Sequence, residues 1–349
     1  MTALPVQPEC PRRVLLIKPS SLGDVVTAMP VLRGLRRSFP QAHISWLVSR
    51  SLAELIAHDR DLDETILFDR QGLAHWWRSP RAGLALWALK RQLRTGRFDW
   101  VIDLQGLFRS GYFARATGAA VRAGFSDARE MARGFYTHAV SVRAAHTVDR
   151  NIELAKALGV DARSEDFTLE LSDAARQFAD AFCRERTLRP GGFVAVAPAT
   201  RWATKAYPVR QWRNVIRALS RDLPVVLLGA PNERDVCAAV REGISGAIDL
   251  SGQTGIAALT GVVAASAGVL CNDSAVMNIA PALNVPAVVM IGPTRAEHTG
   301  PYRLGQALVA DVPCQGCRKR TCRHVTCMQS IEAGRVLDAA RAMLAPRSA

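Results

Sequence analysis

Short apolar runs alternate with segments of helical periodicity along almost the whole chain. The first run, Val14–Ile17, places four apolar residues in succession, which is typical of a strand buried on both faces of a parallel sheet. From Val25 to Leu35 the apolar positions recur at helical spacing, so a strand, a polar turn and a helix follow one another. The same succession starts again at Phe193. This alternation predicts the α/β class, with a doubly wound sheet in each half.

The remaining elements follow from the same patterns. Strands are predicted at residues 43–48, 65–68, 99–103, 121–124, 193–197, 225–228, 247–250, 268–271 and 287–291. Helices are predicted at residues 83–93, from 108, and at 146–158, 209–219, 233–240, 254–265 and 276–283, whereas residues 125–144 are expected to be irregular. Helix breakers in Thr187–Gly192 predict a linker. We therefore expect an N-terminal domain of residues 1–186 and a C-terminal domain of residues 187–349 that ends in a helix.

Composition and charge narrow the function without assigning it. A length of 349 residues with 49% hydrophobic and 22% charged residues suits two globular cores. The net charge of +14 is divided evenly between the two halves, so it favours anionic partners such as phosphorylated small molecules, acidic lipids or nucleic acid. No Walker loop and no Gly-x-Gly-x-x-Gly follows the first strand, which argues against P-loop hydrolases and ordinary dehydrogenases. No secretory signal and no membrane-spanning run are expected.

The segment Arg70–Arg97 combines aromatic and basic residues. It contains seven basic residues and no acidic one, together with Trp76, Trp77 and Trp87. One interpretation is a solvated helix whose tryptophans pack inward. The other is a docking face for an anionic, amphiphilic partner, since Trp and Arg suit a membrane interface. Both interpretations stay open.

Polar residues follow two of the predicted strands. Asp24 falls in the first helical turn after the first strand, where a carboxylate commonly caps the helix. It also lies at the carboxyl end of a strand, where open α/β sheets bind ligands, so it is a candidate base. Asp103, Gln105 and Arg109 follow the strand at residues 99–103 and are expected at the same sheet edge. Turn chemistry is the alternative for Asp103 and Gln105.

Several stretches in order resemble one enzyme family. They are Lys18–Pro30, Val101–Ser110, Asp127–Glu130, His146–Arg150, Thr200–Trp212, Leu250–Thr254 and Asn272–Ala280. Together they are similar to the ADP-heptose:lipopolysaccharide heptosyltransferases, glycosyltransferase family 9, and most similar to the heptosyltransferase I branch. The resemblance implies a GT-B fold, in which two Rossmann-like domains face each other across a cleft. The N-terminal domain is then expected to bind the acceptor and the C-terminal domain the nucleotide sugar.

The resemblance also implies an activity. It predicts an inverting, metal-independent transfer of heptose from ADP-heptose to the lipopolysaccharide inner core, with no cofactor. Asp24 is then the base that activates the acceptor hydroxyl, with Asp103 in reserve, and Lys205 stabilises the departing diphosphate. A monomer is expected, cytoplasmic and peripherally bound to the inner face of the cytoplasmic membrane, with a lipid-anchored phosphorylated saccharide as acceptor and no nucleic-acid partner.

Individual residues are carried over at the matching positions. The donor candidates are Thr200, Arg201, Lys205, Gly252, Thr254, Asp273, Ser274, Ala275 and Asn278. The acceptor candidates are Ser21, Gly23, Asp103, Gln105, Arg109, Arg129 and Arg150. The family usually has Gly and His where this chain has Ala275 and Asn278, which puts donor specificity in question. This departure leaves open a glycosyltransferase of the same fold with another nucleotide sugar or acceptor. The net charge of +14 and the basic residues of the C-terminal cysteine cluster leave open a second alternative, a basic nucleic-acid-binding protein.

Four of the eight cysteines gather in a loop at residues 313–328. Their pattern is Cys314-x2-Cys317-x4-Cys322-x4-Cys327, which recurs in heptosyltransferase II-like members of the family. The spacing is compatible with a structural zinc site, with a disulfide pair or with reduced thiols. The basic residues between the cysteines could bind phosphate in each case.

Overall fold

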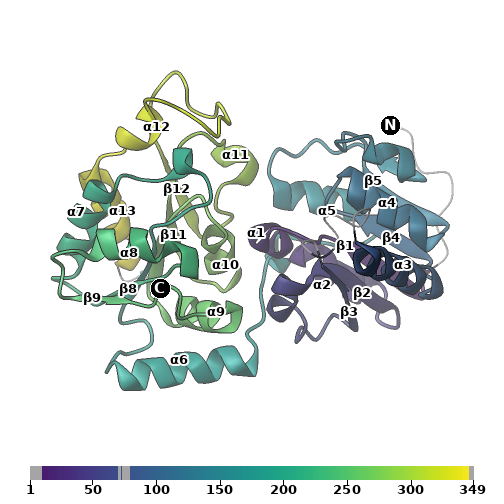
Figure 1. Ribbon diagram of the computed structural model, residues 1–349, viewed down its shortest axis with the longest axis horizontal. Coiled ribbons are helices and arrows are strands. Elements are labelled where there is room, and N and C mark those ends of the chain that lie inside the picture. The colour runs from purple at the N-terminus through teal and green to yellow at the C-terminus, as the bar shows by residue number, and fades with distance from the viewer. Residues whose placement is uncertain (1–9, 70–71, 73–78, 346–349) are drawn as a thin grey trace. The chain divides into compact units, whose positions relative to one another are not determined.

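The computed structural model describes residues 10–69, 72 and 79–345, and its chain divides into two compact units. The first unit ends at Phe167 and the second begins at Thr168. Each unit contains one six-stranded sheet in which every strand pair is parallel (Figure 1). Arg70, Trp76, Trp77 and Arg78 of the basic and aromatic segment lie outside the described residues.

The first unit has the strand order of a dinucleotide-binding sheet. Its strands are β1 (Arg13–Ile17), β2 (His43–Ser49), β3 (Glu64–Phe68), β4 (Trp100–Asp103), β5 (Val121–Phe125) and β6 (His138–Val140). Its helices are α1 (Leu22–Val26), α2 (Met29–Ser38), α3 (Pro80–Thr95), α4 (Phe108–Thr117) and α5 (Thr147–Ala157). The order β3-β2-β1-β4-β5-β6 reverses its direction between β1 and β4.

Both faces of this sheet are covered. Leu15 and Ile17 of β1 pack in one core cluster with Leu93 of α3 and Phe113 of α4. Residues that alternate with them along β1, such as Leu16, are also fully buried. The continuous apolar run that predicted β1 therefore reflects burial on two sides, as in other doubly wound sheets.

The second unit repeats the same strand order. Its strands are β7 (Val194–Ala197), β8 (Val225–Leu227), β9 (Ala247–Asp249), β10 (Gly268–Asn272), β11 (Ala287–Ile291) and β12 (Gly305–Val309). Its helices are α6 (Asp173–Glu185), α7 (Val209–Leu219), α8 (Arg234–Arg241), α9 (Ile256–Ala265), α10 (Val276–Ala282), α11 (Ala296–Thr299), α12 (Thr326–Gln329) and α13 (Ala333–Leu344). The order β12-β11-β10-β7-β8-β9 reverses its direction between β7 and β10.

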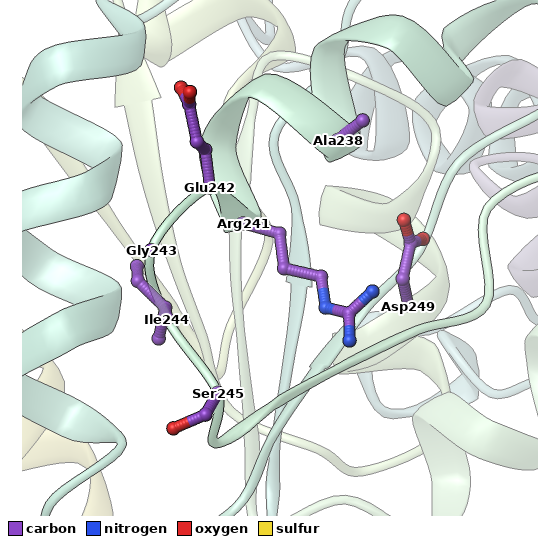
Figure 2. A pocket seen from close by; sticks show the side chains of 7 residues that line it. All are labelled: Ala238, Arg241, Glu242, Gly243, Ile244, Ser245 and Asp249. Carbon is purple, nitrogen blue, oxygen red and sulfur yellow. The ribbon is translucent and has the colours of Figure 1, made fainter.

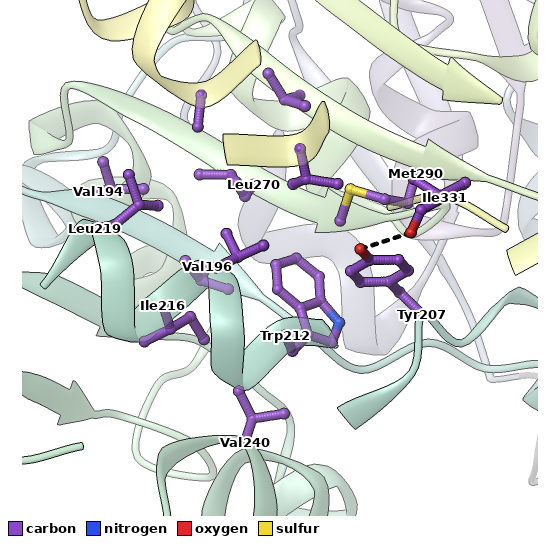
Figure 3. Close-up of a cluster of buried hydrophobic side chains, with 14 of the residues drawn as sticks. Val194, Val196, Tyr207, Trp212, Ile216, Leu219, Val240, Leu270, Met290 and Ile331 are labelled. Carbon is purple, nitrogen blue, oxygen red and sulfur yellow. Dashed lines mark hydrogen bonds between the residues drawn. The ribbon is translucent and has the colours of Figure 1, made fainter. Parts of the chain in front are cut away.

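The core of the second unit ties its early and late segments together. Trp212 of α7 is fully buried and meets Tyr207 edge to face, with 5.5 Å between the ring centroids. The Tyr207 hydroxyl donates a hydrogen bond of 2.9 Å to the carbonyl oxygen of Ile331, just before α13 (Figure 3). The chain that leads into α7 is therefore anchored to the C-terminal helices.

The boundary between the two units differs from the expected one. It falls after Phe167, whereas the linker pattern predicted it after residue 186. The reason is α6, which packs closely on α9: a Cβ atom added to Gly261 would lie 2.2 Å from the carbonyl oxygen of Ala175. The helix breakers at residues 187–192 thus connect α6 to β7 within the second unit.

The predicted fold class, α/β with two doubly wound Rossmann-like units, is confirmed, but several elements differ from the expected ones. The helices α6, α11 and α12 were not predicted. The single helix expected after β1 is two helices, α1 and α2. Two strands were not predicted: β6, inside the segment expected to be irregular, and β12. Among the helices of the described residues, none is long and apolar enough to cross a membrane.

Candidate functional site

The candidate residues lie at the points where each sheet reverses its strand order. In open α/β sheets, ligands bind outside the carboxyl ends of the strands at this reversal. In the first unit, Asp24 follows β1 and Asp103 ends β4. In the second unit, Lys205 follows β7 and Asp273 follows β10. The topology of each unit therefore brings together residues far apart in sequence.

Asp24 caps its helix with one carboxylate oxygen. Its Oδ2 atom accepts hydrogen bonds from the backbone N–H and the hydroxyl of Ser21, at 2.9 and 3.0 Å. The other oxygen, Oδ1, has no hydrogen-bond donor among the described residues, and the side chain is half-buried. Ser21 is exposed and Gly23 is buried beside it. The cap and the base are therefore compatible roles, because they use different oxygens.

Lys18 is a buried lysine close to the carboxylates of Asp24 and Asp103. It was not among the predicted site residues. Its side chain is 5% exposed, and its ammonium donates a 2.6 Å hydrogen bond to the carbonyl oxygen of Leu104. Burial lowers the pKa of Lys18, and the nearby carboxylates of Asp24 and Asp103 oppose that shift. The signal in the sequence was a lysine placed directly after a buried strand.

Asp103 is enclosed by the protein, so its expected roles as reserve base and acceptor contact need correction. The residue has no exposed surface. Its Oδ1 atom accepts from the backbone N–H groups of Gln105 and Gly106 at 2.9 and 3.2 Å, and Oδ2 accepts from the Tyr136 hydroxyl at 2.7 Å. Burial raises the pKa of Asp103, and these hydrogen bonds act in the opposite direction. Asp103 shapes the turn after β4, which is the alternative role that its position also allowed.

Tyr136→Phe tests this role of Asp103. The change removes one donor from a fully buried carboxylate, so the free energy of unfolding should fall by about 1–3 kcal/mol. Urea unfolding followed by circular dichroism measures the loss. Tyr112→Phe is the matched control, because no hydroxyl hydrogen bond ties Tyr112 to the described residues. Equal stability of the two variants would contradict the proposed support of Asp103.

Two arginines expected to bind the acceptor already have contacts within their own unit. The Nη2 atom of Arg150 donates to both carboxylate oxygens of Asp127, at 2.7 and 2.8 Å, and the Arg150 guanidinium lies 5.1 Å from the ring centre of Phe125. Arg109 is exposed, with its guanidinium 5.5 Å from the ring centre of Phe68. Both stay at the predicted edge of the sheet, but Arg150 would have to share its charge with Asp127.

Two further acceptor candidates are less constrained. Arg129 is exposed, and it lies near enough to Lys18 that its charge helps to lower the pKa of that lysine. The Oε1 atom of Gln105 is buried and finds no hydrogen-bond donor in the described part of the chain. Buried acceptors are normally satisfied, so this atom is suited to a hydroxyl group of a ligand or to water.

Asp273 organises the corresponding edge of the second unit. Its Oδ2 atom lies 2.7 Å from the ammonium of Lys205 and accepts a 2.5 Å hydrogen bond from the hydroxyl of Thr294. Thr200 donates to the backbone carbonyl of Asp273 at 3.0 Å. The Lys205 and Asp273 side chains are 15% and 7% exposed. Lys205, expected to face a diphosphate, is thus held in place by a carboxylate expected to bind sugar hydroxyls.

Trp202 connects this ion pair to the cysteine-containing loop. The Lys205 ammonium and the Arg320 guanidinium lie 4.5 and 4.6 Å from the centre of its ring. Beside them, the Thr204 hydroxyl donates a 2.9 Å hydrogen bond to the carbonyl oxygen of Lys319. Cations gain from the face of a tryptophan ring, so the indole holds two positive charges at this edge. Trp202 is not among the site candidates taken from the sequence, whereas Arg320 is one of the loop residues that were expected to be able to bind phosphate.

The donor candidates after β9 and β7 lie at the same ends of the strands. Gly252 adopts a φ of +66°, a left-handed conformation that favours glycine in this turn, and the Arg234 side chain packs close to it. Thr254 follows in the same turn and is half-buried, and Arg201 is exposed next to Thr200.

The remaining donor candidates precede or begin α10. Ser274 and Ala275 are half-buried in the turn after β10. Asn278 is 7% exposed, and its Oδ1 atom lacks a hydrogen-bond donor among residues 10–69, 72 and 79–345. An amide with a free acceptor therefore lies in the first turn of α10, at the position where the resemblance led us to expect an imidazole.

The second unit also has a depression of about 560 Å³ away from these candidate residues. It is formed by the end of α8 and the connection into β9, and Figure 2 shows Arg241 extended toward Asp249 while Glu242 points away. The Arg241 Nε atom donates to the carbonyl oxygen of Ala247 at 2.9 Å. Most of this lining precedes β9, at the opposite end of the strand from Gly252, so it is separate from the site at the strand reversal.

Comparisons with known proteins identify the family of the chain and its fold. The sequence profile of glycosyltransferase family 9 (heptosyltransferase) matches residues 86–327. Lipopolysaccharide heptosyltransferase 1 of Pseudomonas aeruginosa is 32% identical over 325 residues, which are 89% of this chain and 88% of that protein. A glycosyl transferase family 9 structure from Veillonella parvula superposes with a TM-score of 0.80 at 20% identity, covering 95% of this chain and 97% of the other. The structure of Escherichia coli heptosyltransferase WaaC with ADP-2-deoxy-2-fluoro heptose gives 0.75 at 23% identity, covering 95% and 99%.

Proposed function

The chain belongs to glycosyltransferase family 9, the heptosyltransferases, and on that premise we propose that it transfers heptose from ADP-heptose to the inner-core acceptor of lipopolysaccharide. The observation that carries the proposal is the 32% identity with a lipopolysaccharide heptosyltransferase over 89% of the chain. The site residues agree with it, because each unit presents charged groups at its strand reversal.

Asp24 is the proposed general base. The acceptor hydroxyl is a poor nucleophile until its proton is removed, so a carboxylate within hydrogen-bond reach speeds the attack on the anomeric carbon. The Oδ1 atom takes the proton while Oδ2 stays bonded to Ser21, which keeps the side chain oriented during the reaction. The bond to the anomeric carbon forms as the bond to the diphosphate breaks, so the configuration inverts.

Lys205 is the proposed stabiliser of the leaving group. Negative charge grows on the departing diphosphate, and a cation already fixed in position stabilises that charge without reorganisation. The ion pair with Asp273 and the Trp202 ring hold the ammonium of Lys205 in one orientation. Arg201 and Arg320 supply further positive charge on the same edge of the second unit.

The acceptor is proposed to bind along the first unit. Arg109 and Arg129 are exposed there and suit the phosphate or carboxylate groups of an inner-core saccharide. Gln105 offers its unsatisfied oxygen to a sugar hydroxyl. Arg150 is the weaker candidate, because Asp127 already neutralises it.

Mass spectrometry of the reaction products tests the proposal. Purified protein is incubated with ADP-heptose and heptose-deficient core lipids, and the product should gain the mass of one heptose with release of ADP. A parallel panel of other ADP-, UDP- and GDP-sugars tests whether Ala275 and Asn278, which replace the Gly and His expected from the resemblance, change the choice of donor. Transfer from another nucleotide sugar, with none from ADP-heptose, would contradict the proposed donor.

We further propose that α3 docks on an anionic membrane surface. Leu84 and Trp87 are 66% and 59% exposed on this helix, and Arg81, Arg91 and Arg94 lie at neighbouring helical positions. The Arg91 guanidinium lies 5.6 Å from the ring centre of Trp87. Exposed apolar side chains flanked by cations, on a helix without acidic residues, suit an interface of lipid headgroups.

Replacing Arg81, Arg91 and Arg94 together by glutamine should weaken binding to vesicles of phosphatidylglycerol and phosphatidylcholine by about 100-fold, since each basic residue near such a surface contributes about 1 kcal/mol. Co-sedimentation with the vesicles measures the binding. The matched control replaces three exposed arginines of the second unit, Arg210, Arg217 and Arg221, and removes the same charge. Equal losses in both triple variants would show a non-specific charge effect rather than docking through α3.

A further inference from the structure

Three of the four cysteines in the loop at residues 313–328 are more exposed than the cysteines of the core, and the fourth, Cys327, is buried. Cys183, Cys237 and Cys271 are buried, as is usual for cysteine in a core. Cys317 is exposed, and Cys314 and Cys322 are half-buried. All three belong to the stretch between β12 and α12, which has no helix or strand of its own. Packing in a core therefore explains the buried cysteines but not Cys314, Cys317 and Cys322.

The loop cysteines line one cavity. Cys314, Cys317, Cys322 and Cys327 all contribute to the wall of a space of about 40 Å³, which we call the cysteine cavity. Its other walls include Thr204, Pro293 and His324. The volume is close to that of a single water molecule and far below that of a nucleotide or sugar. The cavity therefore suits one ion.

A backbone hydrogen bond in this loop favours the thiolate form of Cys322. The N–H group of Val325 points at the Sγ atom of Cys322, with 3.4 Å between nitrogen and sulfur. A thiolate accepts such a bond much better than a disulfide sulfur does, and the thiolate is the form that binds metal. Gly316, with a φ of +75°, and Arg318, with a φ of +57°, reverse the chain on either side of Cys317.

The charge of the loop fits a bound metal. Four basic residues, Arg318, Lys319, Arg320 and Arg323, lie between the cysteines, and no acidic residue accompanies them. Left alone, these neighbouring cations repel one another. A divalent ion held by four thiolates has a net charge of about −2, which would attract them instead.

We propose that the four thiols of the cysteine cavity bind one zinc ion in a tetrahedral structural site. Zinc favours four sulfur ligands, and the Cys-x2-Cys pair supplies two of them from one turn. As the side chains stand, the described residues contain no group of three or more His, Cys, Asp or Glu placed so that it could hold a metal ion. Binding thus requires the thiols to turn inward, which a rotation about the single side-chain torsion of cysteine allows.

Zinc at this place would brace the donor edge of the second unit. The loop contacts that edge through the hydrogen bond from Thr204 to Lys319 and through Arg320 on the Trp202 ring. A third contact runs from the Gln315 side chain, which donates to the carbonyl oxygen of Thr294 at 3.1 Å. The Thr294 hydroxyl in turn binds Asp273. This bracing role rests on the proposed donor site, whereas the zinc site itself does not.

Metal analysis of the full chain tests the site directly. Protein purified under reducing conditions and passed over a chelating resin should contain about one zinc per chain. Cys317→Ser and Cys322→Ser should lose most of it, while Cys10→Ser, which alters an exposed cysteine outside the loop, should retain it. Replacing the zinc by Co²⁺ should give the visible absorption and the sulfur-to-metal charge-transfer bands of tetrahedral cobalt thiolate.

Three results would overturn the site. They are reduced wild-type protein with less than about one-tenth of a zinc per chain, cobalt spectra without thiolate bands, and a disulfide between two of the four cysteines in protein isolated under reducing conditions. The wild-type measurements need no variant to fold, so instability of a serine variant would not obscure them. None of them depends on the sugar donor.

Calorimetry with ADP as the probe tests the brace. Removing the zinc with a chelator should weaken ADP binding by roughly 5- to 150-fold, the usual range for coupling between two sites. Returning zinc should restore the affinity. Unchanged ADP affinity in a chain that demonstrably binds zinc would overturn the brace, and absence of ADP binding in the zinc-loaded protein would count against the proposed donor site instead.

Discussion

Asp24→Asn is expected to lower the rate of heptose transfer by roughly 100- to 10,000-fold, the usual contribution of a positioned general base. The amide removes the proton acceptor at Oδ1 but keeps an oxygen that can accept from Ser21. The free energy of unfolding should therefore change by less than about 1 kcal/mol. Steady-state kinetics with saturating ADP-heptose, together with urea unfolding, measure the two effects.

A second substitution separates the base from the helix cap. Asp24→Ala removes both oxygens, so it should lose as much activity as Asp24→Asn and in addition about 0.5–2 kcal/mol of stability. Asp173→Asn is the matched control, since Asp173 is an exposed carboxylate in the first turn of α6. Turnover of Asp24→Asn within a few-fold of the wild type would remove Asp24 from the role of base.

Lys205→Ala is expected to have the second largest effect. Removing one preorganised donor to a developing negative charge costs roughly 100- to 1,000-fold in turnover. The substitution also leaves Asp273, which is 7% exposed, without its cation, and an unpaired buried charge is strongly destabilising. Loss of activity in this variant alone would therefore have two explanations.

The double substitution Lys205→Met with Asp273→Asn distinguishes them. It removes both charges, so the protein should regain most of its stability while transfer stays low. Calorimetric titration with ADP, thermal melting and kinetics are compared across the set, with Lys156→Ala on α5 as an exposed-lysine control. If the double variant recovered wild-type transfer, Lys205 would be a structural partner of Asp273 and not a stabiliser of the leaving group.

The strands with continuous apolar runs could be predicted from the sequence. Val14–Ile17 and Ala287–Ile291 are almost entirely apolar, and the structure places them in β1 and β11 within one residue of the expected bounds. The two strands that were not predicted are short or begin with residues that do not favour strands. β6 has the three residues His-Ala-Val, and β12 begins Gly-Gln. They are strands because they extend an existing sheet edge, which local sequence does not reveal.

The candidate site was predictable as a set of positions but not as a set of contacts. Asp24 follows a buried strand and Asp103 ends one. The sequence does not indicate that Tyr136, 33 residues after Asp103, covers Asp103 and not Asp24. Likewise, Lys205 and Asp273 each belong to a motif, but their pairing depends on β7 and β10 being neighbours in the sheet. Contacts of this kind follow from topology and not from spacing.

The packing of α6 on α9 determines where the chain can be cut. A C-terminal fragment that begins at residue 187 would lack α6, so the face of α9 around Gly261 would be exposed to solvent. Apolar helix faces uncovered in this way favour aggregation. A fragment that begins at Thr168 keeps α6 packed on α9. It is therefore the better choice for studying nucleotide binding by the second unit in isolation.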